Sequence, residues 1–217
     1  MTVHHFESQH SVLNRFIAEI RDETVQKDPM RFRRNIERIG EVLCYEMSKT
    51  LRYETQDVRT PYGNKEIALP TDHLVLCSVL RAGLPLHQGL LNYFDRAENA
   101  FISAYREHKN GEDAFSVVVK YFAAPSLDGK TLVLTDPMLA TGKTLENVFM
   151  ALKSHGRPRN IHIISVIASI QGVDYIQKIF PEETHLWVGA MDEELTTRGY
   201  IIPGLGDAGD LAFGLKL

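Results

Sequence analysis

From residue 73 to residue 188 the sequence alternates between short apolar runs and amphipathic stretches. Because each strand-like run is followed by a helix-like stretch, neighbouring strands are expected to be parallel, since a parallel crossover needs a long connection. In such sheets ligands bind beyond the carboxyl ends of the strands. The alternation therefore predicts an α/β fold with a mainly parallel sheet. The predicted strands cover 73–80, 100–105, 131–135, 161–168 and 185–188, and the predicted helices cover 84–94, 144–154 and 173–180.

Two helices and a hairpin are expected before this region. Apolar residues at helical spacing from Leu13 to Ile20 predict a short amphipathic helix. A longer helix is predicted to begin near Asp28, with that carboxylate as its cap and Pro29 in its first turn. The arginines at 31, 33, 34 and 38 are interpreted as a solvated face of this helix. Two extended pieces around Gly63, within 58–69, predict a β-hairpin.

The charge and apolar patterning exclude several classes of protein. The 217 residues include 24 Lys or Arg and 28 Asp or Glu, so the net charge is −4, which disfavours nucleic-acid binding without a local basic patch. No apolar run approaches the roughly 20 residues of a membrane span, and the first residues lack the features of a secretory signal. We therefore expect a cytoplasmic protein that binds neither nucleic acid nor membrane. Cys44 and Cys77 lie in apolar stretches without metal-ligand spacing, so they are expected to be buried free thiols.

The strongest local motif is the segment 132–144, in which a buried strand ends in Asp136 and a hydroxyl-rich turn opens a helix. The N–H groups of a helix start, with the hydroxyls of Thr141 and Thr144, suit a phosphate monoester. A carboxylate beside that phosphate is expected to face ribose hydroxyls, so the segment predicts a ribose 5-phosphate site. Its end resembles a Walker A loop, but Pro137 stands where that loop needs Gly, which disfavours a P-loop kinase.

This turn, Asp136-Pro137-Met138-Leu139-Ala140-Thr141-Gly142, resembles the signature of phosphoribosyltransferases and specifically their uracil branch. Three other blocks resemble the same branch in the same order: 79–84 its pyrophosphate loop, Tyr105-Arg106 its next strand end, and 199–210 its C-terminal uracil loop. The resemblance therefore covers essentially the whole chain. It implies a type I phosphoribosyltransferase fold, with a mainly parallel central sheet flanked by helices, an N-terminal helical segment and a C-terminal hood loop. A single domain is expected, with helices and hairpin in 1–70, the core sheet in 71–190 and the uracil-binding loop and C-terminus in 191–217.

The resemblance also implies an activity, a metal and a set of site residues. The activity is transfer of the phosphoribosyl group of 5-phosphoribosyl pyrophosphate (PRPP) to N1 of uracil, giving UMP and pyrophosphate in pyrimidine salvage, with Mg²⁺ carried on the PRPP. Arg81, Asp136 and Asp207 are expected to be catalytic through positioning and charge, without a covalent nucleophile. Asp207 is also the expected Mg²⁺ contact. The expected uracil contacts are Ile201, Gly206, Asp207 and Ala208. The expected PRPP contacts are Arg81, Arg106, Asp136, Pro137, Met138, Leu139, Ala140, Thr141, Gly142, Lys143, Thr144 and Asp207.

Some features depart from the family pattern or leave alternatives open. Lys143 stands where the uracil branch usually has Gly, and Thr135 stands where many phosphoribosyltransferases carry a first acid. The segment 107–123 also departs from the pattern, and its polar part, 107–114, predicts a mobile loop or hairpin tip. The pyrophosphate loop is expected to carry a strained non-proline peptide. The resemblance further implies a homodimer or higher homo-oligomer and leaves GTP as a possible effector. The alternative function is an RNA-binding regulator on the same fold that senses PRPP or UMP.

Overall fold

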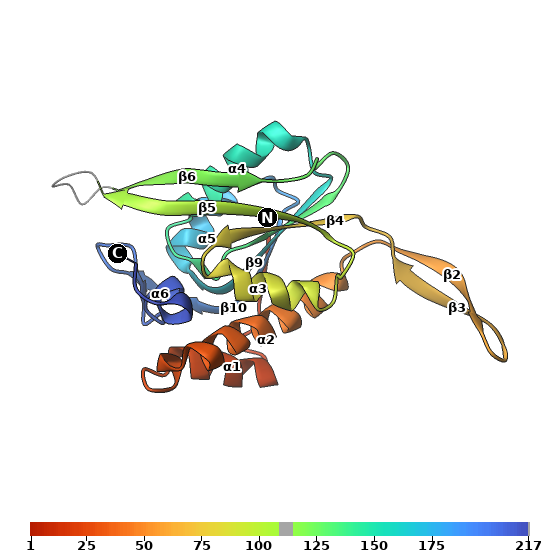
Figure 1. The fold of residues 1–217 in the computed structure, drawn as a ribbon, viewed down its shortest axis with the longest axis horizontal. Helices are drawn as coiled ribbons and strands as arrows, with labels where there is room; N and C mark the ends of the chain where they lie inside the picture. Colours follow the sequence, from red (N-terminus) through yellow and green to blue (C-terminus); the bar gives the residue numbers. More distant parts are fainter. Residues whose placement is uncertain (109–114, 217) are drawn as a thin grey trace.

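A computed structural model describes residues 1–108 and 115–216, with the backbone alone described at 104–108 and 115–120. Its central sheet has the strand order β1-β10-β9-β7-β4-β5-β6, with β8 paired to β9 (Figure 1). Every pairing in this sheet is parallel except that of β5 with β6. The predicted α/β fold with a mainly parallel sheet is therefore confirmed. The strands are β1 (Thr2–His5), β4 (Leu74–Leu80), β5 (Glu98–His108), β6 (Phe115–Ala123), β7 (Thr131–Thr135), β8 (Met138–Leu139), β9 (Asn160–Ser169) and β10 (His185–Asp192).

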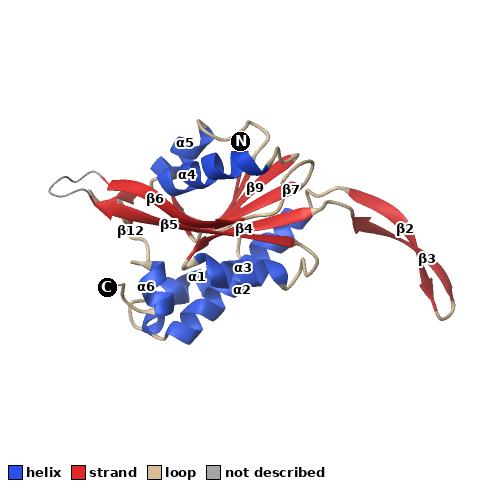
Figure 2. Cartoon of the chain, turned by 45° about the horizontal axis from the view of Figure 1, so that its top comes forward, coloured by secondary structure: helices blue, strands red, loops and turns tan. Residues whose placement is uncertain are grey.

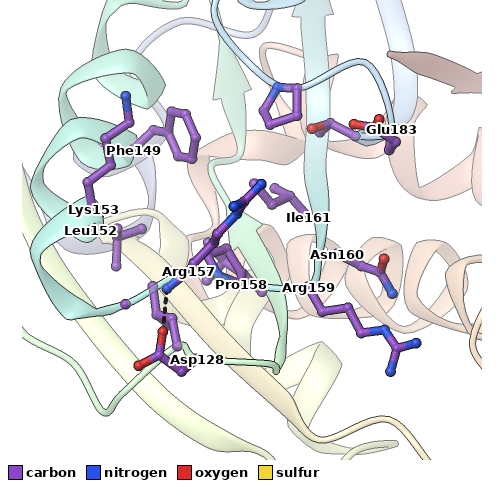
Figure 3. A pocket seen from close by; sticks show the side chains of 15 residues that line it. Asp128, Phe149, Leu152, Lys153, Arg157, Pro158, Arg159, Asn160, Ile161 and Glu183 are labelled. Carbon is purple, nitrogen blue, oxygen red and sulfur yellow. Dashed lines mark hydrogen bonds between the residues drawn. The ribbon is translucent and has the colours of Figure 1, made fainter.

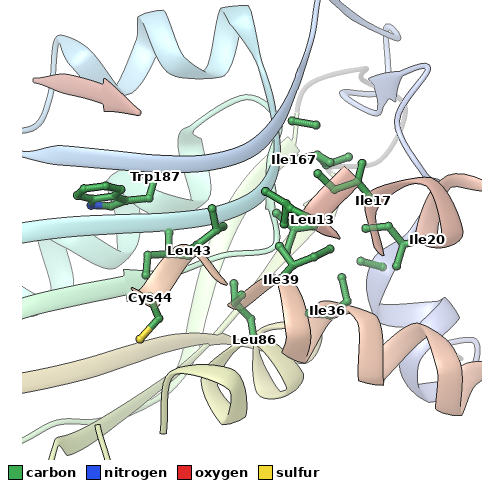
Figure 4. Packing of buried hydrophobic residues seen from close by; sticks show 14 of the residues in the cluster. Leu13, Ile17, Ile20, Ile36, Ile39, Leu43, Cys44, Leu86, Ile167 and Trp187 are labelled. Atoms are coloured by element: carbon green, nitrogen blue, oxygen red, sulfur yellow. The ribbon is translucent and has the colours of Figure 1, made fainter. Parts of the chain in front are cut away.

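Helices cover both faces of this sheet (Figure 2). One face packs against α1 (Val12–Arg21), α2 (Pro29–Ser48) and α3 (Gly83–Leu91), and the other against α4 (Lys143–Leu152) and α5 (Ile170–Gln177). Successive residues of β4 enter opposite cores, as expected for a strand with both faces buried: Leu76 lies in the first core and Cys77 in the second. Figure 4 shows the first core, where side chains of α1 and α2 meet the sheet beside Trp187.

The two predicted N-terminal helices, the predicted Asp28 cap and the predicted hairpin are confirmed. Ser11 caps α1 by accepting from the Leu13 N–H at 3.3 Å, and Asp28 caps α2 by accepting from the Met30 N–H at 3.0 Å. The hairpin consists of β2 (Tyr53–Thr60) and β3 (Gly63–Pro70), which form a separate sheet that projects from the body (Figure 1). The interpretation of the α2 arginines holds for Arg31 and Arg34, which form surface ion pairs.

Three parts of the chain differ from the sequence analysis or lie beyond it. Strand β1 was not predicted, because a short polar segment at a sheet edge carries no apolar pattern. Strand β6 brings residues 115–123 into the sheet as the partner of β5. Of the predicted mobile loop or hairpin tip at 107–114, residues 107 and 108 lie in β5 and residues 109–114 lie outside the described residues. Both cysteines are buried and free, as predicted, and Trp187 is buried in the core. Among the described residues, no helix is long and apolar enough to span a bilayer.

Three histidines surround Trp187 at the β1 edge of the sheet. Trp187 donates its indole N–H to Nδ1 of His162 at 3.2 Å, and the ring of His4 stacks on the indole with a centroid distance of 3.8 Å. Nε2 of His4 lies within hydrogen-bond distance of Nδ1 of His185, at 3.0 Å. Burial, followed by the nearby His185, lowers the pKa of His162 to about 4, and burial also lowers the pKa values of His4 and His185. The cluster therefore favours neutral rings in the folded chain.

This cluster predicts that the protein loses stability in mild acid. Because the folded-state pKa of His162 lies below the value near 6.5 in the unfolded chain, the unfolded chain takes up a proton first as pH falls. We expect the free energy of unfolding to drop by roughly 3 kcal/mol between pH 6.5 and 4 from this residue. Urea unfolding across that range measures the loss. His162→Gln should flatten the profile and the exposed His10→Gln should not; an unchanged slope in His162→Gln would refute this origin.

Candidate functional site

The loops that follow β4 and β7 lie side by side at one edge of the sheet. The two strands are parallel neighbours, and Ser78 of β4 is in register with Thr135 of β7. Arg81 follows the end of β4 and Asp136 follows the end of β7, so both residues lie at the carboxyl edge where ligands bind in such sheets. The structure therefore brings two of the predicted site residues to adjacent loops.

The turn between β7 and α4 is fixed on two sides by hydrogen bonds. The Val166 N–H donates to the Pro137 carbonyl at 3.1 Å, and the Leu139 N–H donates to Ser165 Oγ at 3.2 Å. The Ser169 hydroxyl donates to the Ala140 carbonyl at 2.6 Å. These bonds tie the turn to β9 and to the start of α5, so the turn is a rigid cradle. A small hollow is lined by Asp136, Met138, Leu139, Ala140, Thr141, Gly142, Thr144 and Leu145.

Gly142 is the N-cap of α4 and has a φ of +77°, a left-handed conformation that favours glycine. A Cβ at this position would lie 2.8 Å from Cδ1 of Tyr175, so the close approach of α5 also requires glycine. N–H groups in the first turn of a helix lack a preceding helical carbonyl and are suited to bind a phosphate. Asp136 accepts from the Met138 N–H at 3.2 Å, which holds its carboxylate beside this cradle.

Arg81 connects the loop after β4 to the C-terminal loop. Its Nη2 donates to Oδ1 of Asp210 at 2.6 Å, and its Nη1 donates to the Gly214 carbonyl at 3.0 Å. The peptide bond between Leu80 and Arg81 is cis. Arg106, the other predicted arginine, lies on β5, but its side chain is outside the described residues. The guanidinium of Arg81 therefore faces the C-terminal loop that the sequence analysis assigned to uracil.

The C-terminal loop is a folded structure with its own caps and pairing. Strands β11 (Glu194–Leu195) and β12 (Ile201–Ile202) pair antiparallel, and α6 (Ala208–Phe213) follows. Ile201 is buried, and Gly204, at φ +58°, lies so close to the Ile201 carbonyl that a Cβ would collide with it. Asp207 caps α6 by accepting from the Asp210 N–H at 3.0 Å, and its other oxygen faces Nζ of Lys216 at 3.1 Å. Although burial opposes its ionisation, these donors hold the pKa of Asp207 below its usual value.

The anchor of this loop was not found by sequence reasoning. Arg21, at the end of α1, binds both oxygens of Asp192, at the end of β10, at 2.8 and 2.9 Å. The same pair holds the loop backbone, because the Gly204 N–H donates to Asp192 at 3.2 Å and the Gly204 carbonyl accepts from Arg21 at 3.0 Å. The two side chains come from opposite ends of the chain, and neither stands in a local motif. Only the fold brings them together.

A separate cavity of about 740 Å³ lies at the opposite edge of the sheet, near the starts of β7 and β9 (Figure 3). Phe149 and Lys153 come from α4 and its C-terminal extension, and Arg157 points toward the middle of the cavity. None of the predicted site residues lines this cavity. The cavity therefore does not coincide with the predicted site, whose residues lie on loops at the carboxyl edge of the sheet. Among the described residues, no cluster of three or more His, Cys, Asp or Glu side chains is placed to hold a metal ion.

Comparison with known proteins identifies the family. The profile of the family described as uracil phosphoribosyltransferase matches residues 7–215. A uracil phosphoribosyltransferase of Porphyromonas gingivalis is 51% identical over 217 residues, which is 100% of both chains, and one of Methanothermobacter thermautotrophicus is 40% identical over 86% of this chain and 85% of its own. The solved structure of a protein from Aquifex aeolicus superposes with a TM-score of 0.86 at 31% identity, covering 99% of this chain and 100% of that one. Because the profile and these relatives span nearly its whole length, this chain belongs to the uracil phosphoribosyltransferase family.

Proposed function

We propose that this protein transfers the 5-phosphoribosyl group of PRPP to N1 of uracil, giving UMP and pyrophosphate. The observation that carries the proposal is the meeting of three loops at one edge of the sheet. The phosphate-type turn at 136–142 lies beside the Arg81 loop, and Arg81 in turn binds the C-terminal loop at Asp210. A phosphate, a leaving pyrophosphate and a base can thus be held around one sugar.

The turn and Asp136 orient the sugar in this proposal. The 5-phosphate binds at the start of α4, where Thr141, Gly142 and Thr144 supply N–H and hydroxyl donors. The carboxylate of Asp136 accepts hydrogen bonds from the ribose 2′- and 3′-hydroxyls. Holding the phosphate and the hydroxyls together fixes C1′ against the attacking base, which converts binding energy into correct alignment.

The charge that develops at C1′ and on the leaving group determines the other roles. As pyrophosphate departs, the ribose takes on oxocarbenium character, and the carboxylate of Asp136 stabilises that positive charge. Arg81 and Arg106 bind the leaving pyrophosphate, because the planar guanidinium group of arginine can donate two hydrogen bonds to phosphate oxygens at once. Carboxylate oxygens suit a hard cation, and Asp207 is partly exposed, so this residue would hold Mg²⁺ delivered on PRPP once its second oxygen is released from Lys216. Bound Mg²⁺ would neutralise the pyrophosphate.

The C-terminal loop selects the base. Ile201 is buried in β12, and Ala208 is buried at the start of α6, so the backbone between them is held in a fixed shape. Backbone N–H and C=O groups of Ile201, Gly206 and Ala208 pair with the two carbonyls and the N3–H of uracil. Cytosine presents an amino group and an acceptor at the matching positions, so a fully paired site rejects it.

The test of this function is UMP formation from labelled uracil, PRPP and Mg²⁺. We expect product with uracil and none with cytosine. ATP turnover without PRPP would point to a kinase instead, and salt-sensitive binding of RNA without UMP formation would point to a pyrimidine-sensing regulator.

The contact between Arg81 and Asp210 predicts a competition with PRPP. In the described structure the guanidinium is paired with an internal carboxylate at 2.6 Å, and this partner must be given up or shared when pyrophosphate binds. We expect Asp210→Asn to lower the KM for PRPP about threefold, the effect of a partly exposed ion pair of under 1 kcal/mol. Steady-state kinetics measure it, with the exposed Asp174→Asn as the matched control. A raised KM would show that Asp210 helps to bind PRPP rather than competing with it.

The assembly, effector and location expected from the resemblance belong to the same proposal. We propose a homodimer or higher homo-oligomer in the cytoplasm, with GTP as an effector to be tested by adding it to the assay. The β2–β3 hairpin supports assembly, because it projects from the body and exposes Tyr53, Tyr62 and Ile67 (Figure 2). Large apolar side chains on an isolated two-stranded arm are costly to expose to water.

Replacing 55–68 by a short Gly-Ser loop is expected to lower the mass measured by sedimentation velocity, and an unchanged mass would place the interface elsewhere.

A further inference from the structure

Four polar side chains form a chain of hydrogen bonds beneath the site, in an otherwise apolar layer. The Ser78 hydroxyl lies 2.5 Å from the Thr135 hydroxyl and 2.7 Å from Nδ1 of His87, and Nε2 of His87 lies 2.7 Å from Oδ1 of Asn99. Ser78, Thr135 and His87 are at most 3% exposed. Ser78, Thr135, His87 and Asn99 come from β4, β7, α3 and β5, so the row of hydrogen bonds joins three strands and a helix.

The direction of every hydrogen bond in this chain is determined by its outer end. The amide nitrogen of Asn99 donates to the Ala97 carbonyl at 3.1 Å, which turns the amide oxygen toward His87. Nε2 of His87 must therefore carry the hydrogen, and in the neutral ring Nδ1 is an acceptor. The Ser78 hydroxyl then gives its one hydrogen to Nδ1, so the hydrogen between the two hydroxyls comes from Thr135, whose contact to the Cys77 carbonyl is longer at 3.4 Å. Burial lowers the pKa of His87, which favours this neutral, directed arrangement.

This row of hydrogen-bonded side chains lies at the base of both loops of the proposed PRPP site. Ser78 is three residues before Arg81, and Thr135 immediately precedes Asp136. Gly83, which opens α3 after the Arg81 loop, rests on the same two residues, since a Cβ there would lie 3.5 Å from Cβ of Ser78 and 3.6 Å from the Thr135 carbonyl. The hydrogen bonds thus join the base of the Arg81 loop to the base of the Asp136 turn.

We infer that His87 is a positioning residue for PRPP, which through Ser78 and Thr135 fixes the Arg81 loop relative to Asp136. This inference rests on the proposed function, because it assigns PRPP to these two loops. PRPP must contact Arg81 with its pyrophosphate and Asp136 with its ribose hydroxyls at once. A shift between the two loops therefore weakens PRPP binding. The uracil loop touches Arg81 through Asp210 and Gly214, but it has a second anchor in Arg21 and Asp192, so it depends less on the position of the Arg81 loop.

The test compares His87→Leu, which removes both ring nitrogens, with His87→Asn, which keeps an acceptor for Ser78. We expect His87→Leu to raise the KM for PRPP, and its dissociation constant by calorimetry, about tenfold, the loss of one to two buried hydrogen bonds. The KM for uracil should stay within about twofold, because Arg21 and Asp192 still anchor the base-binding loop, and His87→Asn should recover most of the PRPP affinity. The exposed His10→Leu is the matched control.

The outcomes distinguish a role of His87 in positioning PRPP from a role in core packing alone. A folded His87→Leu protein with unchanged PRPP affinity would overturn the inference, as would an equal rise in both KM values. If His87→Leu does not fold, Ser78→Ala removes one hydroxyl from the same chain and should raise the KM for PRPP severalfold. A wild-type protein that forms no UMP and binds no PRPP would instead refute the proposed function.

Discussion

Replacing Asp136 by Asn is expected to lower kcat/KM for UMP formation by about a hundredfold to a thousandfold, the range for removing one stabiliser of transition-state charge. The substitution keeps the shape of the side chain. An amide oxygen can still accept from the Met138 N–H, which Asp136 binds at 3.2 Å, so the turn should keep its fold. The negative charge is lost, and with it the stabilisation of a ribose that becomes cationic at C1′.

The measurement is initial-rate kinetics with labelled uracil at several PRPP concentrations, accompanied by urea unfolding. We expect an unfolding midpoint close to that of the wild type, because the turn is tied to β9 and α5 by backbone and serine contacts that remain. Asp95→Asn, an exposed carboxylate in the turn between α3 and β5, is the matched control and should change neither quantity. Activity within a few-fold of wild type in Asp136→Asn would remove this residue from the proposed mechanism.

Local patterns predicted the parts of the fold whose causes are local. The cap of α2 was predicted from Asp28, which accepts hydrogen bonds from the next turn, whereas the Ser11 cap of α1 was not predicted. Strand β7 was predicted with its observed bounds, because five buried residues precede the acid that ends it. The strand-to-helix turn at 136–142 was predicted because its signal lies within a few consecutive residues, and its assignment to a phosphate stays a prediction. Each of these features depends on neighbours in sequence.

The features that sequence reasoning missed depend on contacts between distant segments. Strand β1 forms because β10 offers a parallel partner to Thr2–His5, and nothing within those residues signals it. The chain through Ser78 and His87 carried only a weak signal, a serine inside an apolar strand and a histidine on the apolar side of a helix. Its meaning depends on Thr135 and Asn99, which lie on other elements. Thr135 is fully buried, with its hydroxyl against that of Ser78.

Replacing Asp192 by Leu is expected to lower the free energy of unfolding by about 3–5 kcal/mol, the cost of leaving one buried charge without its partner. The Asp192 side chain is 7% exposed and that of Arg21 is 18% exposed, so water replaces little of the pairing that the guanidinium would lose. The change also removes the acceptor of the Gly204 N–H, which lies in the loop assigned to uracil. Urea unfolding measures the first effect and the KM for uracil measures the second.

The double variant Arg21→Met with Asp192→Leu distinguishes the two effects. Two apolar side chains of similar length can pack where the ion pair was, so we expect the double variant to recover most of the lost stability. The KM for uracil should stay raised in both proteins, because both lack the Asp192 acceptor for the Gly204 N–H. If the double variant regained normal uracil affinity as well, the ion pair would serve only stability, and the shape of the uracil loop would have to be set by its own glycines and by the Asp207 cap.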